Sequence, residues 1–75
     1  MQVMERFAPK NKVQRYAYDK WGVTDAESFA ARVSRKIKRG TARTIWLYAS
    51  TNHQPDQLKA AADMLGTTIE ELFYS

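Results

Sequence analysis

Apolar residues recur every three or four positions along most of the chain, which is the spacing of helices that bury one face. Val13, Ala17 and Trp21 follow this spacing between Pro9 and Gly22. Proline suits the first turn of a helix, and glycine commonly ends one. The pattern therefore predicts a first helix that begins near Pro9 and ends at Gly22.

A second helix is predicted from a capping box, in which Thr24 accepts hydrogen bonds from first-turn amides and Glu27 reaches back to the cap residue. The apolar positions that follow step by three and four: Ala26, Phe29, Ala30, Val33 and Ile37. Gly40 is expected to end this helix, because glycine is favoured just after a helical C-terminus.

The segment from 45 to 49 combines β-branched and aromatic residues, which are compatible with a strand as well as with a helix. We favour a third helix, because Gly40 and Thr41 supply a stop followed by a new cap. Three large residues are expected in the core: Trp21, Ile45 and Tyr48. Trp46 is adjacent to Ile45, so partial burial and an exposed contact to a partner both stay open for it.

Residues 50–54 are polar and predict a connector. Pro55 and Asp56 then begin a fourth helix, whose end is expected at Gly66. Its apolar positions form one stripe: Leu58, Ala61, Ala62 and Leu65.

A short fifth helix follows, for which two capping pairs compete: Thr67 with Glu70, and Thr68 with Glu71. Residues 1–8 show no clear period and are expected to form a loose N-terminal arm. Residues 9–75 thus predict a single small all-α domain of four to five helices. At this size one hydrophobic core gives only a few kcal/mol of net stability.

The composition excludes several classes of protein. An apolar share of 44% beside a charged share of 27% is ordinary for a folded domain. Cysteine is absent and there is one histidine, so we expect no disulfide framework, no metal and no cofactor. Without a glycine-rich phosphate loop or a cysteine nucleophile, we expect no enzyme and no small-molecule substrate. No apolar run suits a membrane span or a signal peptide, so we expect a cytoplasmic, nucleoid-associated protein.

Positive charge is concentrated in the middle of the chain. The net charge is +4, but residues 28–55 contain no acidic residue. All their basic residues fall within twelve positions: Arg32, Arg35, Lys36, Lys38, Arg39 and Arg43. Phosphate is the natural counterpart of such a field, while the alternative is a solvated helical face that binds nothing.

The junction at Gly40 and Thr41 predicts a tight corner between two helices, which is the arrangement of a helix-turn-helix. The first turn of the second helix then enters the DNA major groove. Base contacts are expected from Thr41, Arg43 and Thr44. Arg43 is the strongest candidate, because its planar fork can donate two hydrogen bonds to guanine. Phosphate contacts are expected from five residues: Arg35, Lys36, Lys38, Arg39 and Asn52.

Two stretches resemble the Cro/C1-type helix-turn-helix domains of bacterial and phage repressors. The stretch LKAAADMLGTTIEELF, from Leu58 to Phe73, is similar to the last two helices of that family. The stretch GVTDAESFA, from Gly22 to Ala30, resembles the entry into its first motif helix, and Thr41 and Ile45 match the cap and a core position of its recognition helix. The resemblance implies a lambda-repressor-like fold that binds double-stranded DNA.

The chain departs from this family in two places. Between Ala30 and Ile45 it has about five residues more than the usual motif, which implies a longer helix or a longer turn. Ala49 stands where the family often has an acidic residue. The stretch GTARTIWLY, residues 40–48, is also similar to the recognition helix of MerR-type winged domains, which we rank second.

We therefore expect a small bacterial or phage transcriptional regulator that binds double-stranded DNA in a sequence-specific way, with a recognition helix that starts near Thr41. A homodimer is expected through Leu72, Phe73 and Tyr74, unless these residues close the monomer core instead. The alternative function is a small helical protein-interaction module, similar to an antirepressor, that binds another regulator instead of DNA. Rising salt separates the two, because each phosphate contact contributes about 0.9 to the log-log slope of DNA binding.

Overall fold

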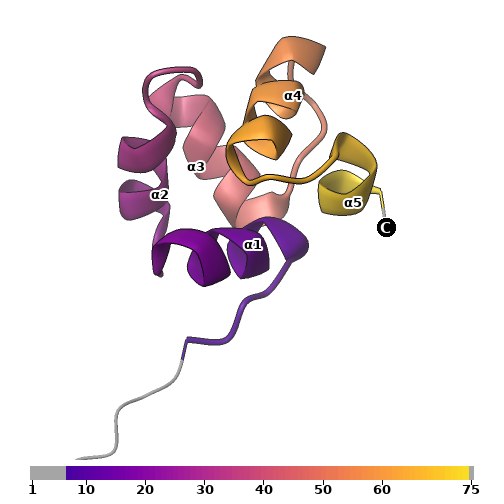
Figure 1. The fold of residues 1–75 in the computed structure, drawn as a ribbon. Helices are drawn as coiled ribbons and strands as arrows, with labels where there is room; N and C mark the ends of the chain where they lie inside the picture. The colour runs from indigo at the N-terminus through magenta and orange to yellow at the C-terminus, as the bar shows by residue number, and fades with distance from the viewer. Residues whose placement is uncertain (1–6, 75) are drawn as a thin grey trace, which may run out of the picture.

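The computed structural model describes residues 7–74, and within them it has five helices and no strand (Figure 1). The helices are α1 Lys12–Trp21, α2 Ala26–Val33, α3 Arg39–Tyr48, α4 Pro55–Met64 and α5 Ile69–Phe73. They form one small all-α domain, so the predicted fold class is confirmed. Most of the expected N-terminal arm, residues 1–6, lies outside the described residues.

The first helix begins at Lys12, three residues after Pro9, and is tied to the end of α3. Asn11, and not Pro9, precedes α1, because its side chain accepts a 2.8 Å hydrogen bond from the amide of Gln14. The side chains of Asn11 and Gln14 both donate to the backbone oxygen of Trp46, at 3.1 and 2.8 Å. Gln14 is 5% exposed and also accepts from the amide of Lys10, so this buried amide is fully engaged.

The second helix is capped by Asp25, so the predicted capping box of Thr24 and Glu27 is wrong. The Asp25 carboxylate accepts a 2.7 Å hydrogen bond from the amide of Ser28, which lowers the pKa of Asp25 below its ordinary value of 3.8. Asp is as good an N-cap as Ser and better than Thr, and it lies one residue closer to the helix. Glu27 is left free of any capping role.

The prediction that this helix continues to Gly40 is also wrong, because α2 ends at Val33. The backbone oxygen of Val33 accepts from the amides of Lys36 and Ile37 at 3.0 and 2.9 Å, which closes a turn. Ile37 is 1% exposed, so the turn that follows α2 keeps this side chain in the core. Residues 34–38 connect α2 to α3.

The third helix begins before the position predicted for its cap. Lys38 is the N-cap, without a side-chain capping hydrogen bond, and Gly40 lies in the first turn of α3. Thr41 is therefore inside the helix and does not cap it. The expected tight corner at Gly40 and Thr41 is replaced by the longer connection of residues 34–38.

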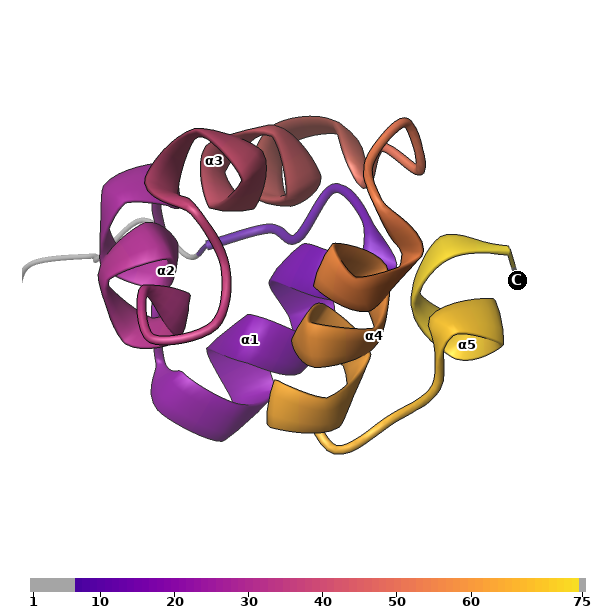
Figure 2. The same cartoon turned by 90° about the horizontal axis from the view of Figure 1, so that it is seen from above.

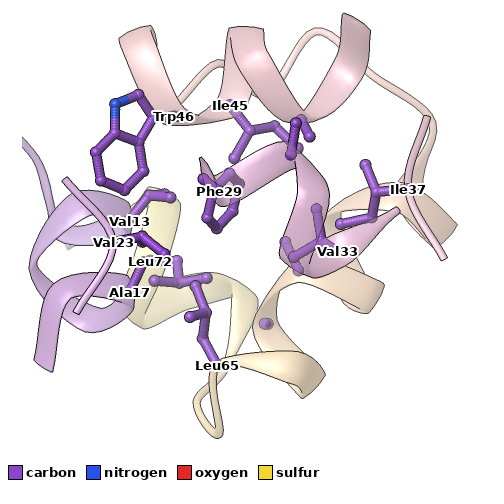
Figure 3. Close-up of a cluster of buried hydrophobic side chains, with 14 of the residues drawn as sticks. Val13, Ala17, Val23, Phe29, Val33, Ile37, Ile45, Trp46, Leu65 and Leu72 are labelled. Atoms are coloured by element: carbon purple, nitrogen blue, oxygen red, sulfur yellow. The ribbon is translucent and has the colours of Figure 1, made fainter. Parts of the chain in front are cut away.

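The core is built around Phe29 of α2, which lies in the middle of the side chains drawn in Figure 3. Its ring centroid is 5.4 Å from that of Trp46, and Ile45 packs on the same cluster. Trp46 is 3% exposed, so burial is the correct one of its two interpretations. Ile45 is buried as predicted, whereas Tyr48 is 74% exposed and its expected place in the core is wrong.

Two other aromatic residues cover the edge of this core. Trp21 is half-buried against the cluster, which only partly matches the prediction of a core residue. Phe7, expected in the loose arm, is packed with its ring centroid 5.1 Å from that of Tyr18 and 5.8 Å from that of Trp46. The last part of the arm that the structure describes is therefore attached to the domain.

The C-terminal part follows the sequence pattern closely. Pro55 begins α4, and Gly66, with φ of 72°, provides the left-handed turn after it. Thr68, one of the two predicted caps, accepts from the amide of Glu71. Leu72 is 3% exposed and fills the monomer core, so it is not available as a dimer contact. Phe73 is half-buried, and Tyr74 is 66% exposed.

Glu71 links α5 to α1. Its carboxylate accepts hydrogen bonds from Lys12 at 2.9 Å and from the hydroxyl of Tyr16 at 3.2 Å. The hydrogen bond and charge of Lys12, followed by the Tyr16 bond, hold the pKa of Glu71 below its ordinary value of 4.5. This contact therefore favours the folded state when the carboxylate is ionised.

We expect Gln14→Ala to lower the free energy of unfolding by about 1–3 kcal/mol, because it removes the buried hydrogen bond to the backbone oxygen of Trp46 and leaves the amide of Lys10 without its acceptor. Urea unfolding followed by tryptophan fluorescence measures the change. The control is Arg15→Ala, an exposed position of the same helix. Equal stability of the two variants would contradict the role given to Gln14.

We expect Glu71→Gln to flatten the pH dependence of stability in acid. Because the folded-state pKa of Glu71 is depressed, its stabilisation is present above the ordinary value of 4.5 and is lost as the pH falls through the folded-state pKa. Thermal unfolding from neutral pH to well below that value measures this, with Glu70→Gln as the matched control. An unchanged acid slope in Glu71→Gln is the contrary result.

Candidate nucleic-acid interface

One side of α3 is fixed in the core, and this determines which side faces outward. Ala42, Ile45 and Trp46 are buried, at the spacing of a helix that packs on one stripe. The opposite side carries the predicted DNA-contacting residues. In Figure 2, α3 runs along one edge of the molecule, with α1 and α4 to one side of it. The outward side of α3 is therefore accessible to a large partner.

The three predicted base-contacting residues do not share one stripe. Thr41 and Arg43 are two positions apart, which separates them by about 200° around the helix axis. Thr41 is half-buried and Arg43 is exposed, so they lie on opposite flanks of α3. Thr44 lies between them, and its hydroxyl donates a 3.0 Å hydrogen bond to the backbone oxygen of Gly40.

Arg43 is part of a three-residue ion cluster that the sequence did not predict. Its Nε lies 3.2 Å from one carboxylate oxygen of Glu27, and Nη1 of Arg39 lies 3.5 Å from the other. The three side chains are 52% exposed for Arg43, 66% for Arg39 and 57% for Glu27. The cluster is solvent-exposed, so it orients the arginines without contributing much stability.

The other flank of α3 borders an open hollow of about 400 Å³ between its N-terminus and the α3–α4 connector. The structure brings Lys38, Thr41 and Asn52 together here, although the sequence assigned them separately to phosphate and base contacts. His53, Gln54, Asp56 and Gln57 complete the lining. The hollow is polar, and the Asp56 carboxylate offsets part of the positive charge of Lys38.

The N-terminus of α3 strengthens the positive field at this hollow. Its N-cap, Lys38, makes no side-chain capping hydrogen bond, and its first turn has no acidic residue. The first amides of a helix carry a partial positive charge and have no partner within the helix. Such an end favours an anionic group.

The connector between α2 and α3 is held from α4. The side-chain amide of Gln57 donates to the backbone oxygen of Lys36 and accepts from the amide of Lys38, both at 3.4 Å. The side chains of Arg35, Lys36 and Lys38 stay exposed on this connector. Three of the five predicted phosphate contacts thus lie on one short segment of fixed backbone.

Arg32 lies in a different environment from Arg35, Lys36 and Lys38. Its guanidinium lies 5.7 Å from the ring centroid of Trp21, within cation–π range. It is engaged with the end of α1, whereas Arg39 and Arg43 are engaged with Glu27. The six central cations are all exposed, but they divide among three local environments and do not form one continuous row.

The sequence interpretation missed the outward residues at the end of α3. Leu47 and Tyr48 are 48% and 74% exposed. Tyr48 lies four positions after Thr44, which places both on one stripe of the helix. That spacing could have identified Tyr48, because the burial of Ile45 and Trp46 directs the following two side chains outward.

We expect Gln57→Ala to speed hydrogen exchange at the amide of Lys38 and to lower the free energy of unfolding by about 1 kcal/mol, because the connector loses both hydrogen bonds to α4. NMR detects the exchange. Gln54→Ala is the control, since the side chain of Gln54 makes no capping hydrogen bond. Unchanged exchange at Lys38 would show that Gln57 does not hold the connector.

The described residues contain no group of His, Asp or Glu side chains placed to hold a metal ion. Among the same residues, none of the helices has the length and apolar character needed to cross a membrane. Comparison of the chain with protein-family models, curated proteins and solved structures gave no significant match. The likeness to Cro/C1-type domains therefore rests on the residues quoted above.

Proposed function

We propose that this protein binds double-stranded DNA in a sequence-specific way, with α2 and α3 as a helix-turn-helix and α3 as the recognition helix. The observation that carries the proposal is the outward side of α3, where a positive helix N-terminus is flanked by exposed cations on both sides. A helix of this kind fits a major groove about 12 Å wide. The role of a small bacterial or phage regulator comes from the resemblance to Cro/C1-type domains.

Two kinds of contact are assigned to the two flanks of α3. Arg43 and Thr44 face the bases, because Glu27 contacts Arg43 at Nε, while the terminal nitrogens are those that pair with a guanine edge. Lys38, Thr41 and Asn52 hold a phosphate at the hollow beside the N-terminus of α3. Thr41 is thereby moved from a base contact to a phosphate contact.

The cationic connector adds affinity without sequence preference. Arg35 and Lys36 lie in an exposed segment that precedes α3, within reach of the backbone beside the groove. Such contacts position a protein on DNA but carry no sequence information. Tyr48 extends the base-facing stripe of Thr44 and offers a hydroxyl and an apolar ring to the groove.

A protein-interaction module remains the second candidate, and one observation favours it. Leu47 and Tyr48 are adjacent, exposed and largely apolar, as expected of a surface that binds another protein. In that case the basic residues surround a protein contact, and a duplex is not the partner.

Anisotropy of a labelled mixed-sequence duplex, titrated at several salt concentrations, distinguishes the two functions. The three cationic phosphate contacts of Arg35, Lys36 and Lys38 predict a log-log slope of roughly −2.7. Selection of bound duplexes from a random pool then provides the preferred sequence. No binding at low salt, together with capture of a protein partner at high salt, supports the second candidate.

We expect Arg43→Ala to weaken binding to the selected duplex by about 1–3 kcal/mol and to relax the preference at one base pair. The comparison variant is Lys38→Ala, which should weaken binding to all duplexes similarly and lower the salt slope by about one. An Arg43→Ala variant with an unchanged sequence preference would refute the assignment of Arg43 to a base.

A further inference from the structure

Glu27 is an acidic residue inside the cationic surface. It belongs to the first turn of α2, and its two carboxylate oxygens each pair with a different arginine of α3. Asp25, and not Glu27, caps α2, so the carboxylate of Glu27 makes no capping hydrogen bond, although the helix dipole favours an acidic residue in the first turn. A side chain that neutralises two cations of a DNA-binding surface lowers affinity for phosphate, and this calls for a reason.

The geometry of the ion pair between Glu27 and Arg43 gives a reason for this acidic residue. Glu27 contacts Arg43 through Nε, at 3.2 Å, which is the guanidinium nitrogen nearest the backbone. The two terminal nitrogens of Arg43 are those that donate in parallel to O6 and N7 of guanine. An exposed pair at Nε biases the planar fork toward one orientation without fixing it, so less side-chain freedom is lost when the fork binds a base.

The charge of Glu27 acts differently on the two kinds of DNA contact. A guanine edge carries only partial negative charge, so a carboxylate behind the guanidinium repels it much less than it repels a phosphate. A phosphate is an anion, and it must either replace Glu27 at Arg39 and Arg43 or approach it against like-charge repulsion. Because the ion pairs of Glu27 are solvent-exposed, they open at a modest cost in free energy. This cost lowers the affinity for non-specific DNA.

We propose that Glu27 is a specificity-determining residue, which positions the Arg43 fork for a base and withholds Arg39 and Arg43 from phosphates. The inference rests on the proposed DNA-binding function and deepens it. Glu27 is a positioning residue in this role, because it acts through the two arginines and does not touch DNA. Its removal therefore raises affinity for generic DNA and lowers selectivity.

The experiment compares Glu27→Gln with Glu70→Gln on two duplexes, the mixed-sequence duplex and the duplex selected from a random pool. Glu70→Gln gives the same change of net charge as Glu27→Gln. Glu70 is exposed and belongs to α5, which lies at the opposite end of the molecule from α2 in Figure 2. We expect Glu27→Gln to bind the mixed-sequence duplex roughly three- to tenfold more tightly and to steepen the salt slope by about one. The ratio of selected to mixed-sequence affinity should fall, while Glu70→Gln changes affinity by less than about twofold.

A second readout does not depend on DNA. The Nε–H resonance of Arg43 in a ¹⁵N-labelled sample should shift in Glu27→Gln and not in Glu70→Gln. Equal effects of the two variants on binding, or an unmoved Arg43 resonance, overturn this inference while the proposed function stands. Failure of the unmodified protein to bind any duplex at low salt overturns both.

Discussion

The burial of one stripe of α3 against Phe29 is the constraint on which the rest of the structure depends. Ile45 and Trp46 occupy this stripe, and fully burying side chains of this size contributes about 1.5–3 kcal/mol each. For a domain of this length such terms are a large part of the net stability. Since the stripe cannot rotate out of the core, the positions of Arg43 and Thr44 on the outside follow from it.

The two ends of α3 are held by different parts of the chain. At its C-terminal end, the backbone oxygen of Trp46 receives hydrogen bonds from Asn11 and Gln14 of the α1 entry. At its N-terminal end, Gln57 of α4 binds the backbone on both sides of Ile37. The helix that we propose for recognition is therefore positioned before any ligand arrives, which reduces the ordering cost of binding.

The parts of the fold that were predictable from the sequence are those governed by local rules. Pro55 at the start of α4 is predicted correctly, and Thr68 is one of the two caps predicted for α5, because both residues act within their own helical turn. The end of α2 is not predictable in this way, because Ile37 keeps the spacing of the buried stripe although the helix has already ended at Val33. Glycine at position 40 signals a helix end by propensity, yet it is tolerated near an exposed helix start.

In the candidate site, too, local features are predictable from the sequence and contacts between helices are not. The exposure of the central cations followed from the charge pattern, since exposed charges need no partner. The pairing of Arg43 with Glu27 did not, because it joins residues sixteen positions apart on two helices and the sequence offered a local capping role for Glu27. The expected burial of Tyr48 fails for a related reason: it stands two positions after Trp46, so the two side chains cannot share one buried stripe, and the sequence leaves the burial of Trp46 open.

Amide chemical-shift mapping with an unlabelled duplex at low salt tests the central claim most directly. If α3 is the recognition helix, the largest perturbations lie in residues 36–48 and in the connector 50–54, while α5 is unaffected. Perturbations centred on α5 or on the exposed part of α1 would contradict the claim, and so would an unchanged spectrum.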